Sequence, residues 1–258
     1  MKILYDHQSF SGAKYGGVAR YFYDLMYNLK YEQGVDVELA LKFSNNDYLK
    51  NGDIKKIIPF KFFLGYAKTN MLFSHINRLN SAVQLSLKDY DVFHPTYFKD
   101  YFLPFLGKKP FVITHHDVIP EKFPDKYASL DGFDKNQKQK ILDKASKIIA
   151  VSENTKQDIL DVFKISPEKV EVIYHSTHFA TFVPNSTIKV NTPNRYLLYI
   201  GNRDNYKNFD VFVRAIAPIL HKQDDLYLIC GGNGVFTTFE QNLFAELKVS
   251  KQIIHQEI

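Results

Sequence analysis

Two cations at the end of a predicted strand are the side chains whose type and spacing best suit chemistry. Arg203 and Lys207 follow the apolar run at residues 196–200, which ends at Gly201 and is typical of a buried parallel strand. Apolar residues then recur at helical spacing, which predicts a helix over residues 207–221. A phosphate group suits this position, because the N–H groups and dipole of a helix N-terminus attract anions. A plain strand–helix connection with a solvated Arg and Lys is the alternative.

Two glycines form a second candidate site near the start of the chain. Gly16 and Gly17 come just before the helix predicted over residues 18–30, where they would let the backbone approach a ligand closely. Arg20 lies in the first turn of that helix, where it is a candidate for contact with an acceptor. A flexible turn is the alternative.

A histidine and an acid follow a further predicted strand. His116 and Asp117 offer an imidazole and a carboxylate, but neighbouring residues need not face each other, so adjacency alone does not make a catalytic dyad. A structural role is the default for any one histidine. Glu153 and Gly232 also come directly after predicted strands, the first at a helix start capped by Ser152 and the second in a glycine-rich turn.

These candidate residues all lie at the carboxyl ends of strands in two alternating strand–helix arrays, where open parallel sheets bind ligands. The first array is predicted to have strands at 2–5, 35–41, 91–94, 110–114, 147–151 and 170–174, and helices at 18–30, 70–87, 135–145 and 153–163. The second is predicted to have strands at 196–200, 226–230 and 253–255, and helices at 207–221 and 237–247. Residues 178–194 carry Pro, Asn and Thr with little periodicity, which predicts a linker between domains 1–177 and 195–258.

Composition narrows the class of protein. The chain has 258 residues, of which 45% are hydrophobic, so a folded α/β protein is expected. No run is long and apolar enough to span a bilayer, and the first residues lack the apolar core of a signal peptide, so we expect a cytoplasmic location. The net charge of +5 is modest, and no nucleic-acid-binding motif is apparent. The single cysteine, Cys230, lies in an apolar run and is interpreted as a core thiol.

The phosphate-site motif resembles the donor-diphosphate motif of retaining GT-B glycosyltransferases of family four. The positions that carry the resemblance are Gly201, Asn202, Arg203, Tyr206, Lys207, Asn208 and Phe209. Segments 15–21 (YGGVARY), 116–124 (HDVIPEKFP) and 151–155 (VSENT) also resemble family segments, in the family's order. At residues 172–176 the chain reads VIYHS where the family usually has VIYNG, so His175 and Ser176 depart from the pattern.

The resemblance implies a GT-B fold, with a Rossmann-like N-terminal domain on the acceptor side and an incomplete Rossmann-like C-terminal domain that binds a nucleotide-sugar. It implies transfer of a hexose from UDP- or GDP-hexose to a hydroxyl of a glycan or lipid-linked acceptor, with retention. Such an enzyme would serve bacterial polysaccharide or lipopolysaccharide synthesis at the inner face of the membrane.

The resemblance also assigns roles to residues. The catalytic positions are His116 and Asp117; the diphosphate contacts are Arg203, Lys207, Gly201, Asn208, Gly16 and Gly17; and the other cleft residues are Arg20, Glu153 and Gly232. We expect no metal and no cofactor, because two cations and a helix dipole can neutralise the leaving diphosphate.

One alternative function and one membrane hypothesis stay open, and two other enzyme classes fit the sequence poorly. The family's second domain continues for about a hundred further residues, so a catalytically incompetent half that pairs with a partner is one alternative. An oxidoreductase would need G-x-G-x-x-G after the first strand, a spacing that this sequence lacks. A GT-B epimerase fits the Arg203–Lys207 motif poorly. The basic and apolar stretch at residues 55–68 suits an anionic membrane surface, with core aromatics and solvated lysines as its alternative.

Overall fold

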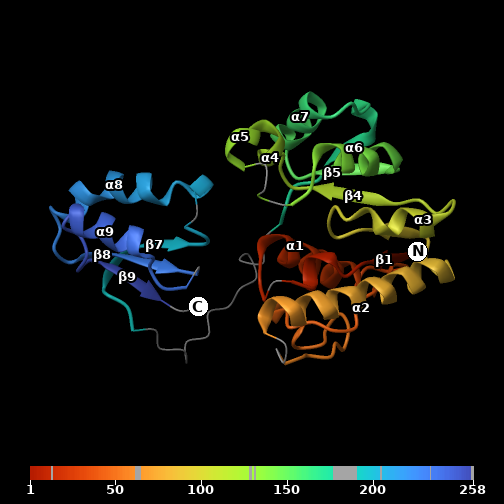
Figure 1. Ribbon diagram of the computed structural model, residues 1–258, viewed down its shortest axis with the longest axis horizontal. Coiled ribbons are helices and arrows are strands. Elements are labelled where there is room, and N and C mark those ends of the chain that lie inside the picture. Colours follow the sequence, from red (N-terminus) through yellow and green to blue (C-terminus); the bar gives the residue numbers. More distant parts are fainter. Residues whose placement is uncertain are drawn as a thin grey trace. The chain divides into compact units, whose positions relative to one another are not determined.

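The chain forms two compact α/β units, Met1–His178 and Phe179–Ile258 (Figure 1). The computed structural model describes every residue except 13, 62–64, 128, 129, 131, 177–190, 204, 233, 257 and 258. The linker predicted at 178–194 therefore lies mostly outside the described residues. Each unit is described below by itself.

The first unit alternates strands and helices along the whole of its length. Its strands are β1 (Lys2–Tyr5), β2 (Asp36–Leu39), β3 (Val92–His94), β4 (Val112–His115), β5 (Lys147–Ala150) and β6 (Val170–Val172). Its helices are α1 (Gly17–Leu29), α2 (Tyr66–Leu87), α3 (Leu103–Leu106), α4 (Ile119–Lys122), α5 (Pro124–Tyr127), α6 (Lys135–Lys144) and α7 (Glu153–Val162). Pro120 and Pro124 lie in the first turns of the short helices α4 and α5, a position where Pro is favourable.

All strand pairs of this unit are parallel. The strands form two three-stranded sheets, in the orders β2-β1-β3 and β4-β5-β6, and a parallel bridge between Phe93 and Phe111 joins them. The chain moves from β1 to β2 on one side and then returns to β3 on the other. This reversal at β1 is a topological switch point, where open α/β sheets bind ligands at the carboxyl ends of their strands.

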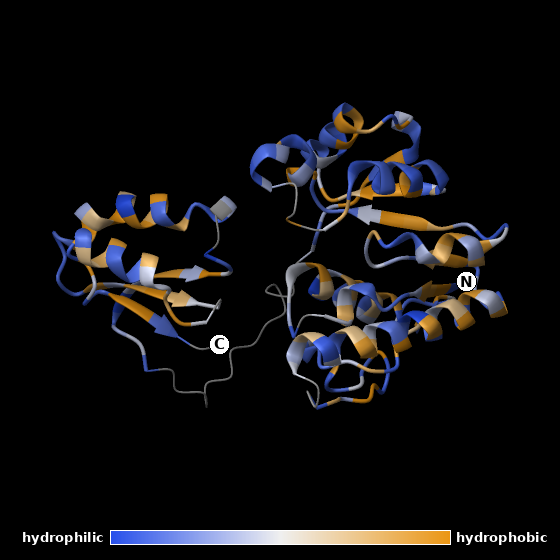
Figure 2. Cartoon of the chain, in the orientation of Figure 1, coloured by the Kyte–Doolittle hydropathy of each residue, from blue (hydrophilic) through white to orange (hydrophobic). Residues whose placement is uncertain are grey.

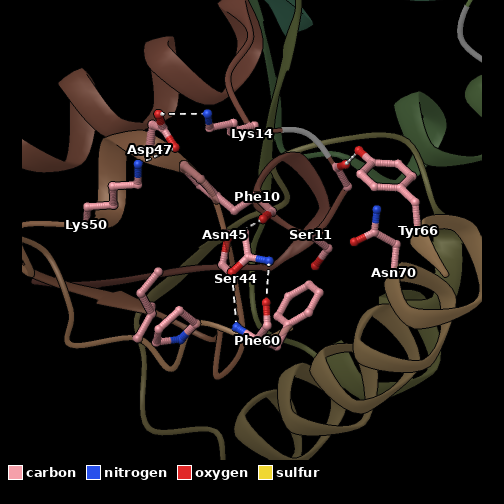
Figure 3. A pocket seen from close by; sticks show the side chains of 13 residues that line it. Phe10, Ser11, Lys14, Ser44, Asn45, Asp47, Lys50, Phe60, Tyr66 and Asn70 are labelled. Atoms are coloured by element: carbon pink, nitrogen blue, oxygen red, sulfur yellow. Dashed lines mark hydrogen bonds and ion pairs between the residues drawn. The ribbon is translucent and has the colours of Figure 1, made fainter. Parts of the chain in front are cut away.

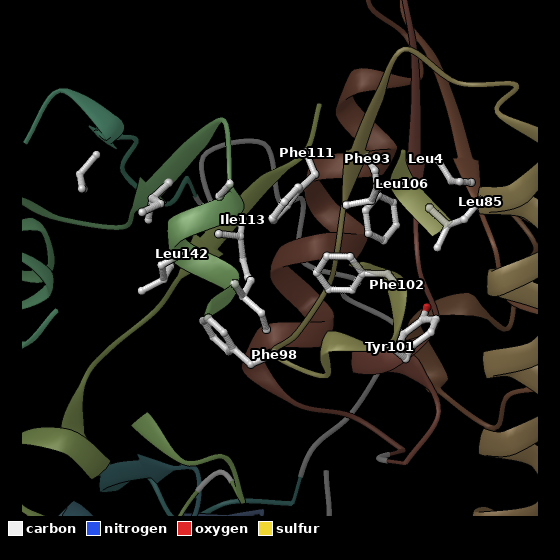
Figure 4. Packing of buried hydrophobic residues seen from close by; sticks show 14 of the residues in the cluster. Leu4, Leu85, Phe93, Phe98, Tyr101, Phe102, Leu106, Phe111, Ile113 and Leu142 are labelled. Atoms are coloured by element: carbon white, nitrogen blue, oxygen red, sulfur yellow. The ribbon is translucent and has the colours of Figure 1, made fainter. Parts of the chain in front are cut away.

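Side chains of β1 alternate between two hydrophobic clusters. Ile3 and Tyr5 pack with Phe22 of α1, whereas Leu4 packs with Leu85 of α2. Because successive side chains of a strand point to opposite faces of the sheet, helices cover both faces of β1. Figure 2 shows the hydrophobic residues concentrated on the strands, and Figure 4 shows Leu4 and Leu85 in the larger cluster with Phe93 and Phe102.

Helix starts in this unit follow local sequence signals. The Ser152 side chain accepts a hydrogen bond from the Thr155 N–H, so Ser152 is the N-cap of α7, as predicted. The Asp134 side chain caps α6 in the same way. Buried residues Ala19, Phe22 and Met26 recur at helical spacing along α1. No helix in the described part of either unit is long and apolar enough to cross a membrane.

The second unit is a three-stranded parallel sheet with two helices. Its elements are β7 (Arg195–Ile200), α8 (Phe209–Leu220), β8 (Leu226–Gly231), α9 (Thr238–Glu246) and β9 (Ile253–Gln256), with strand order β7-β8-β9. Leu228 and Cys230 of β8 pack against both helices. Cys230 is a core thiol, as predicted, and its burial raises its pKa to about 12.

The expectation that β7 is buried on both faces is wrong. Leu197 and Tyr199 pack against the core of the second unit, but Tyr196, Leu198 and Ile200 are 44%, 55% and 66% exposed. The helices α8 and α9 cover one face of the sheet, and the alternating side chains of β7 leave an apolar row on the other. A second difference is that a 3-10 turn at Asn205–Lys207 precedes α8, which begins at Phe209 instead of residue 207.

Candidate active site

Three aromatic rings meet at the carboxyl end of the sheet in the first unit. The Tyr21 ring, from α1, stacks on His175, with centroids 4.7 Å apart and planes 30° apart. The edge-on contact between Tyr21 and His116 spans 5.1 Å, and the His116 and His175 centroids are 5.6 Å apart. The three residues come from α1, from the loop after β4 and from the loop after β6. Only tertiary structure brings them together.

Two further residues anchor Tyr21 beneath this cluster. Its hydroxyl lies 3.1 Å from Oγ1 of Thr114, and that Oγ1 lies 3.0 Å from Nε2 of His94. The threonine hydroxyl can accept a hydrogen bond from one partner and donate one to the other, so both bonds can form at once. Burial raises the pKa of Tyr21, and its bond to Thr114 opposes this only in part, so the phenol is neutral at physiological pH.

His116 is held as a neutral imidazole. Burial, with a smaller repulsion from His175, lowers its pKa to about 4. Its Nε2 is buried and has no hydrogen-bond partner among the described residues. Its backbone carbonyl accepts a hydrogen bond from Thr155 Oγ1 at 3.4 Å, which ties this loop to the first turn of α7. A buried ring nitrogen without a partner is costly, and a ligand hydroxyl would satisfy it.

Asp117 and His116 do not form a dyad in the described part of the chain. Its side chain is exposed, and Oδ1 accepts a hydrogen bond from the Ile119 N–H at 3.1 Å, so it shapes the turn into α4. His115, the residue before His116, is fully buried in contact with the rings of Phe98 and Phe163, and burial lowers its pKa to about 3.

The other predicted residues of the first unit lie on exposed parts of the same strand-end loops. A Cβ at Gly16 or Gly17 would meet nothing within 4 Å, so the space beside both is open. Arg20 is exposed and lies 3.5 Å from Asp24, one helical turn later. Glu153 is exposed in the first turn of α7.

Arg203, in the second unit, is buried among protein partners, whereas its place beside a predicted phosphate site suggested an exposed cation. Its side chain is 1% exposed, and Nε donates to Glu240 Oε1 at 2.6 Å. Its Nη1 donates to the Gly232 carbonyl at 2.8 Å, and Nη2 donates to Gly234 and Val235 at 3.0 and 3.2 Å. The guanidinium also lies against the rings of Phe236 and Phe209 at 4.9 and 5.8 Å. The physical reason for the difference is that these tertiary partners lie roughly 30 residues further along the chain.

Glu240 links this clamp to the start of α9. Its Oε2 accepts from the Thr237 N–H and hydroxyl while the Thr237 hydroxyl accepts from the Glu240 N–H, which completes a capping box. Burial alone would raise the Glu240 pKa, but hydrogen bonds from Arg203 and Thr237 outweigh it and lower that pKa. One carboxylate thus joins the loop after β7 to the loop after β8.

The remaining predicted diphosphate residues surround this clamp. Lys207 is exposed, with Nζ 4.6 Å from the Tyr206 ring centroid. Gly201 has φ +129° and Gly232 has φ +84°, both in the region that favours glycine. Asn208 is the residue before α8 and adopts a left-handed conformation. Asn233 of the glycine-rich turn lies outside the described residues.

A pocket of about 540 Å³ opens near the carboxyl ends of β1 and β2 in the first unit (Figure 3). Its walls combine the apolar side chains of Phe10, Ile57 and Phe60 with polar groups of Asn70 and Asp47. At its rim, Lys14 and Lys50 approach Asp47 at 4.0 and 2.9 Å. The Tyr66 hydroxyl closes one side by donating to the Gly12 carbonyl at 3.2 Å. Polar groups around an apolar interior suit a ligand that is itself amphipathic.

The basic and apolar stretch is partly structural. Lys55 donates to the Leu39 carbonyl at 2.8 Å, and burial lowers its pKa. Phe60 stacks on Phe73 with centroids 4.2 Å apart. Lys56, Lys61 and Lys68 are exposed, whereas Phe62 and Phe63 lie outside the described residues.

No group of three or more His, Cys, Asp or Glu side chains in the described part of the chain is arranged to hold a metal ion. One Asp-x-Asp sequence is present, at residues 89–91 just before β3. Asp89 pairs with the Lys2 ammonium and Asp91 accepts from the Lys2 N–H, both at 2.7 Å. This pair lies at the amino-terminal edge of the sheet, opposite the ring cluster.

Sequence reasoning missed four residues that shape these sites. Tyr21 belongs to the glycine-loop motif, but its sequence context alone carried no role. Thr114 gave no signal beyond its position at a strand end, and His175 was noted only as a departure from the family's sequence pattern. Glu240 could have been found, because Thr237 followed three residues later by Glu is the spacing of a capping box.

Comparisons with known proteins agree with this picture. Residues 15–178, more than half of the chain, match the model of Glycosyltransferase Family 4. The chain is 26% identical over 111 residues to N-acetylgalactosamine-N,N'-diacetylbacillosaminyl-diphospho-undecaprenol 4-alpha-N-acetylgalactosaminyltransferase of Campylobacter jejuni, a match over 43% of this chain and 30% of that relative. The chain thus spans less than a third of the length of this curated relative.

Solved structures share the fold. The apo form of the lipopolysaccharide outer core galactosyltransferase WaaB is 19% identical, with a TM-score of 0.54 over all of this chain and 68% of that one. The UDP-GlcNAc 2-epimerase from Neisseria meningitidis is 11% identical, with a TM-score of 0.58 over all of this chain and 72% of that one. The architecture alone is therefore common to transferases and epimerases. The family match distinguishes them, and by that match this chain belongs to Glycosyltransferase Family 4.

Proposed function

We propose that the protein transfers a hexose from a nucleotide-sugar to a hydroxyl of a glycan or lipid-linked acceptor, with retention at the anomeric carbon. The observation that carries the proposal is the family match over residues 15–178, which includes the loop where His116 Nε2 is buried without a partner among the described residues. The named transferases among the relatives favour bacterial glycan synthesis as its setting, and the cytoplasmic side of the membrane is part of the proposal.

Lys207 is the cation that we propose contacts the donor diphosphate, because it is exposed beside the start of α8. It would neutralise charge on the departing nucleoside diphosphate together with the N-terminal N–H groups of that helix. Arg203 would support the diphosphate site without contacting the diphosphate, since its hydrogen bonds hold the loops after β7 and β8 together. Gly201, Asn208 and Gly232 shape these loops. UDP is our first choice of nucleotide.

His116 would bind the donor sugar. A pKa near 4 leaves its imidazole neutral at physiological pH, so Nε2 can make one hydrogen bond to a sugar hydroxyl, as donor or acceptor according to its tautomer. We assign it no role as a general base. Asp117 would support this loop through its bond to the Ile119 N–H.

The pocket beside β1 and β2 is the proposed acceptor site. Its apolar walls would hold a lipid or aglycone portion, while Asn70 and Asp47 would meet hydroxyl groups. The exposed lysines at residues 56, 61 and 68 favour a peripheral contact with an anionic membrane surface.

The test is a transfer assay on the purified protein with UDP- and GDP-hexoses and an octyl glycoside acceptor, in EDTA and in Mn²⁺. We expect product in EDTA, with the donor's anomeric configuration read by NMR. Activity that EDTA abolishes and Mn²⁺ restores would contradict metal-free transfer, and an inverted product would contradict retention. Conversion of the free UDP-sugar to an epimer would identify an epimerase.

A binding or assembly module is the second candidate function. The apolar row of Tyr196, Leu198 and Ile200 on the second unit favours it, because an exposed row of this kind suits contact with another protein. UDP binding without turnover, in a protein that elutes as a stable complex with a partner, would support this candidate over the transferase.

A further inference from the structure

His175 occupies a position where the chain departs from its family's sequence pattern, and the structure gives it a defined contact. Its ring stacks on Tyr21 at 4.7 Å and 30°, and it faces His116 at 5.6 Å. His175 is exposed on its outer side, while Tyr21 is anchored through Thr114. Tyr21 is therefore held in place by its hydrogen bond to Thr114, whereas His175 is an exposed ring that packs against it.

The orientation of the His116 ring depends on these contacts. Nε2 of His116 is buried and has no hydrogen-bond partner in the described part of the chain. The ring is located instead by Tyr21 at 5.1 Å, by His175 at 5.6 Å and by Phe22 at 6.2 Å. Aromatic contacts of this geometry restrict how a ring turns about its side-chain bonds.

We propose that His175 is a positioning residue, which holds the His116 ring through Tyr21 so that Nε2 faces the donor sugar. This inference rests on the proposed transferase function, because the sugar is the group that Nε2 would meet. Its physical basis is that a pre-oriented side chain loses less freedom when its ligand binds, and reacting groups gain rate from such placement.

The first test needs no turnover. Ring ¹H–¹⁵N signals of His116, assigned by their loss in His116→Gln, are recorded in protein labelled at histidine. We expect these signals to move in His175→Ala and to return toward wild type in His175→Phe, which keeps a stacked ring. Tyr174→Ala is the matched control, because Tyr174 is the neighbouring aromatic residue and is 66% exposed. Unchanged His116 signals in His175→Ala would overturn the proposal.

The second test measures transfer by the same variants. We expect His175→Ala to lower kcat by about 2- to 12-fold, the rate equivalent of one aromatic contact, with little change in the donor KM. His175→Phe should recover most of that loss, and Tyr174→Ala should match wild type. A moved His116 signal with an unchanged kcat would overturn positioning for catalysis. A wild-type protein that transfers no hexose, yet shows the expected signal changes, would refute the proposed function while the ring contact stands.

Discussion

Replacement of Arg203 by alanine should destabilise the second unit before it affects any ligand. The guanidinium is buried, and it donates to Glu240 and to the carbonyls of Gly232, Gly234 and Val235. Removing it would leave the Glu240 carboxylate nearly buried, with only its Thr237 contacts. The loop after β8 would also lose the donor that connects it to the loop after β7.

The size of the effect follows from that burial. Removal of one partner from a buried ion pair costs about 3–5 kcal/mol, because the remaining charge stays out of water. A folded unit of roughly 80 residues has a free energy of unfolding of about 4–12 kcal/mol, so the loss would be a large fraction of the total. Glu240→Gln should also destabilise the unit, because it leaves the buried Arg203 guanidinium without its carboxylate, although the amide keeps an oxygen that can accept the hydrogen bond from Nε.

Backbone hydrogen exchange read over residues 226–247 is the suitable assay, because it reports the second unit separately from the first. Arg195→Ala is the matched control: it removes an arginine from the same unit, whose Nη1 contacts Asp225 at 2.8 Å with both side chains more than half exposed. Such an exposed pair contributes at most about 1 kcal/mol. Calorimetry with UDP on the same samples gives the ligand affinity.

The outcome that would refute this reasoning is specific. If Arg203→Ala changes the free energy of unfolding by less than about 1 kcal/mol and still abolishes UDP binding, then Arg203 leaves Glu240 to contact the diphosphate directly. That result would restore the direct role that its place in the motif suggested.

Three further predictions follow from the geometry. Lys207→Ala should weaken UDP binding by about 1.5–3 kcal/mol in calorimetry while hydrogen exchange stays at wild-type values; equal affinity would remove Lys207 from the site. Lys138→Met should lower the free energy of unfolding by about 3–5 kcal/mol in urea denaturation, because the Glu121 carboxylate stays buried after it loses its 2.5 Å contact with the Lys138 ammonium. Lys140→Met on the same helix is the control, because it removes a more exposed ion pair and should cost under about 1 kcal/mol. Finally, the free energy of unfolding should fall as pH drops below about 6.5. Burial holds the folded-state pKa of His94 and His115 at about 3 and that of His7 and His116 at about 4. The unfolded chain therefore takes up protons at a higher pH than the folded chain, which favours unfolding. The slope of the free energy of unfolding against pH between 6.5 and 5 checks this, and His94→Gln should reduce it; a flat profile would contradict it.

Much of the fold was readable from local patterns. Short apolar runs and helical spacing located every strand that the structure describes and the longer helices, because those patterns reflect which residues are buried. Ser152 predicted the start of α7, since an N-cap acts on its own backbone neighbours. Cys230 was predicted to be a core thiol from its apolar run. Short helices such as α4 and α5 escaped, because four residues are too few to show a period.

The state of each site residue depended on partners far away in sequence. Arg203 looked like a free cation because its own segment is a strand–turn–helix, yet a carboxylate 37 residues later buries it. His175 looked like a departure from the pattern, yet it stacks on a tyrosine more than 150 residues earlier. Local sequence records backbone preference and the burial period of each element. The tertiary structure decides which charges are paired and which rings are in contact, because only the folded chain brings the ends of different strands to the same edge of a sheet.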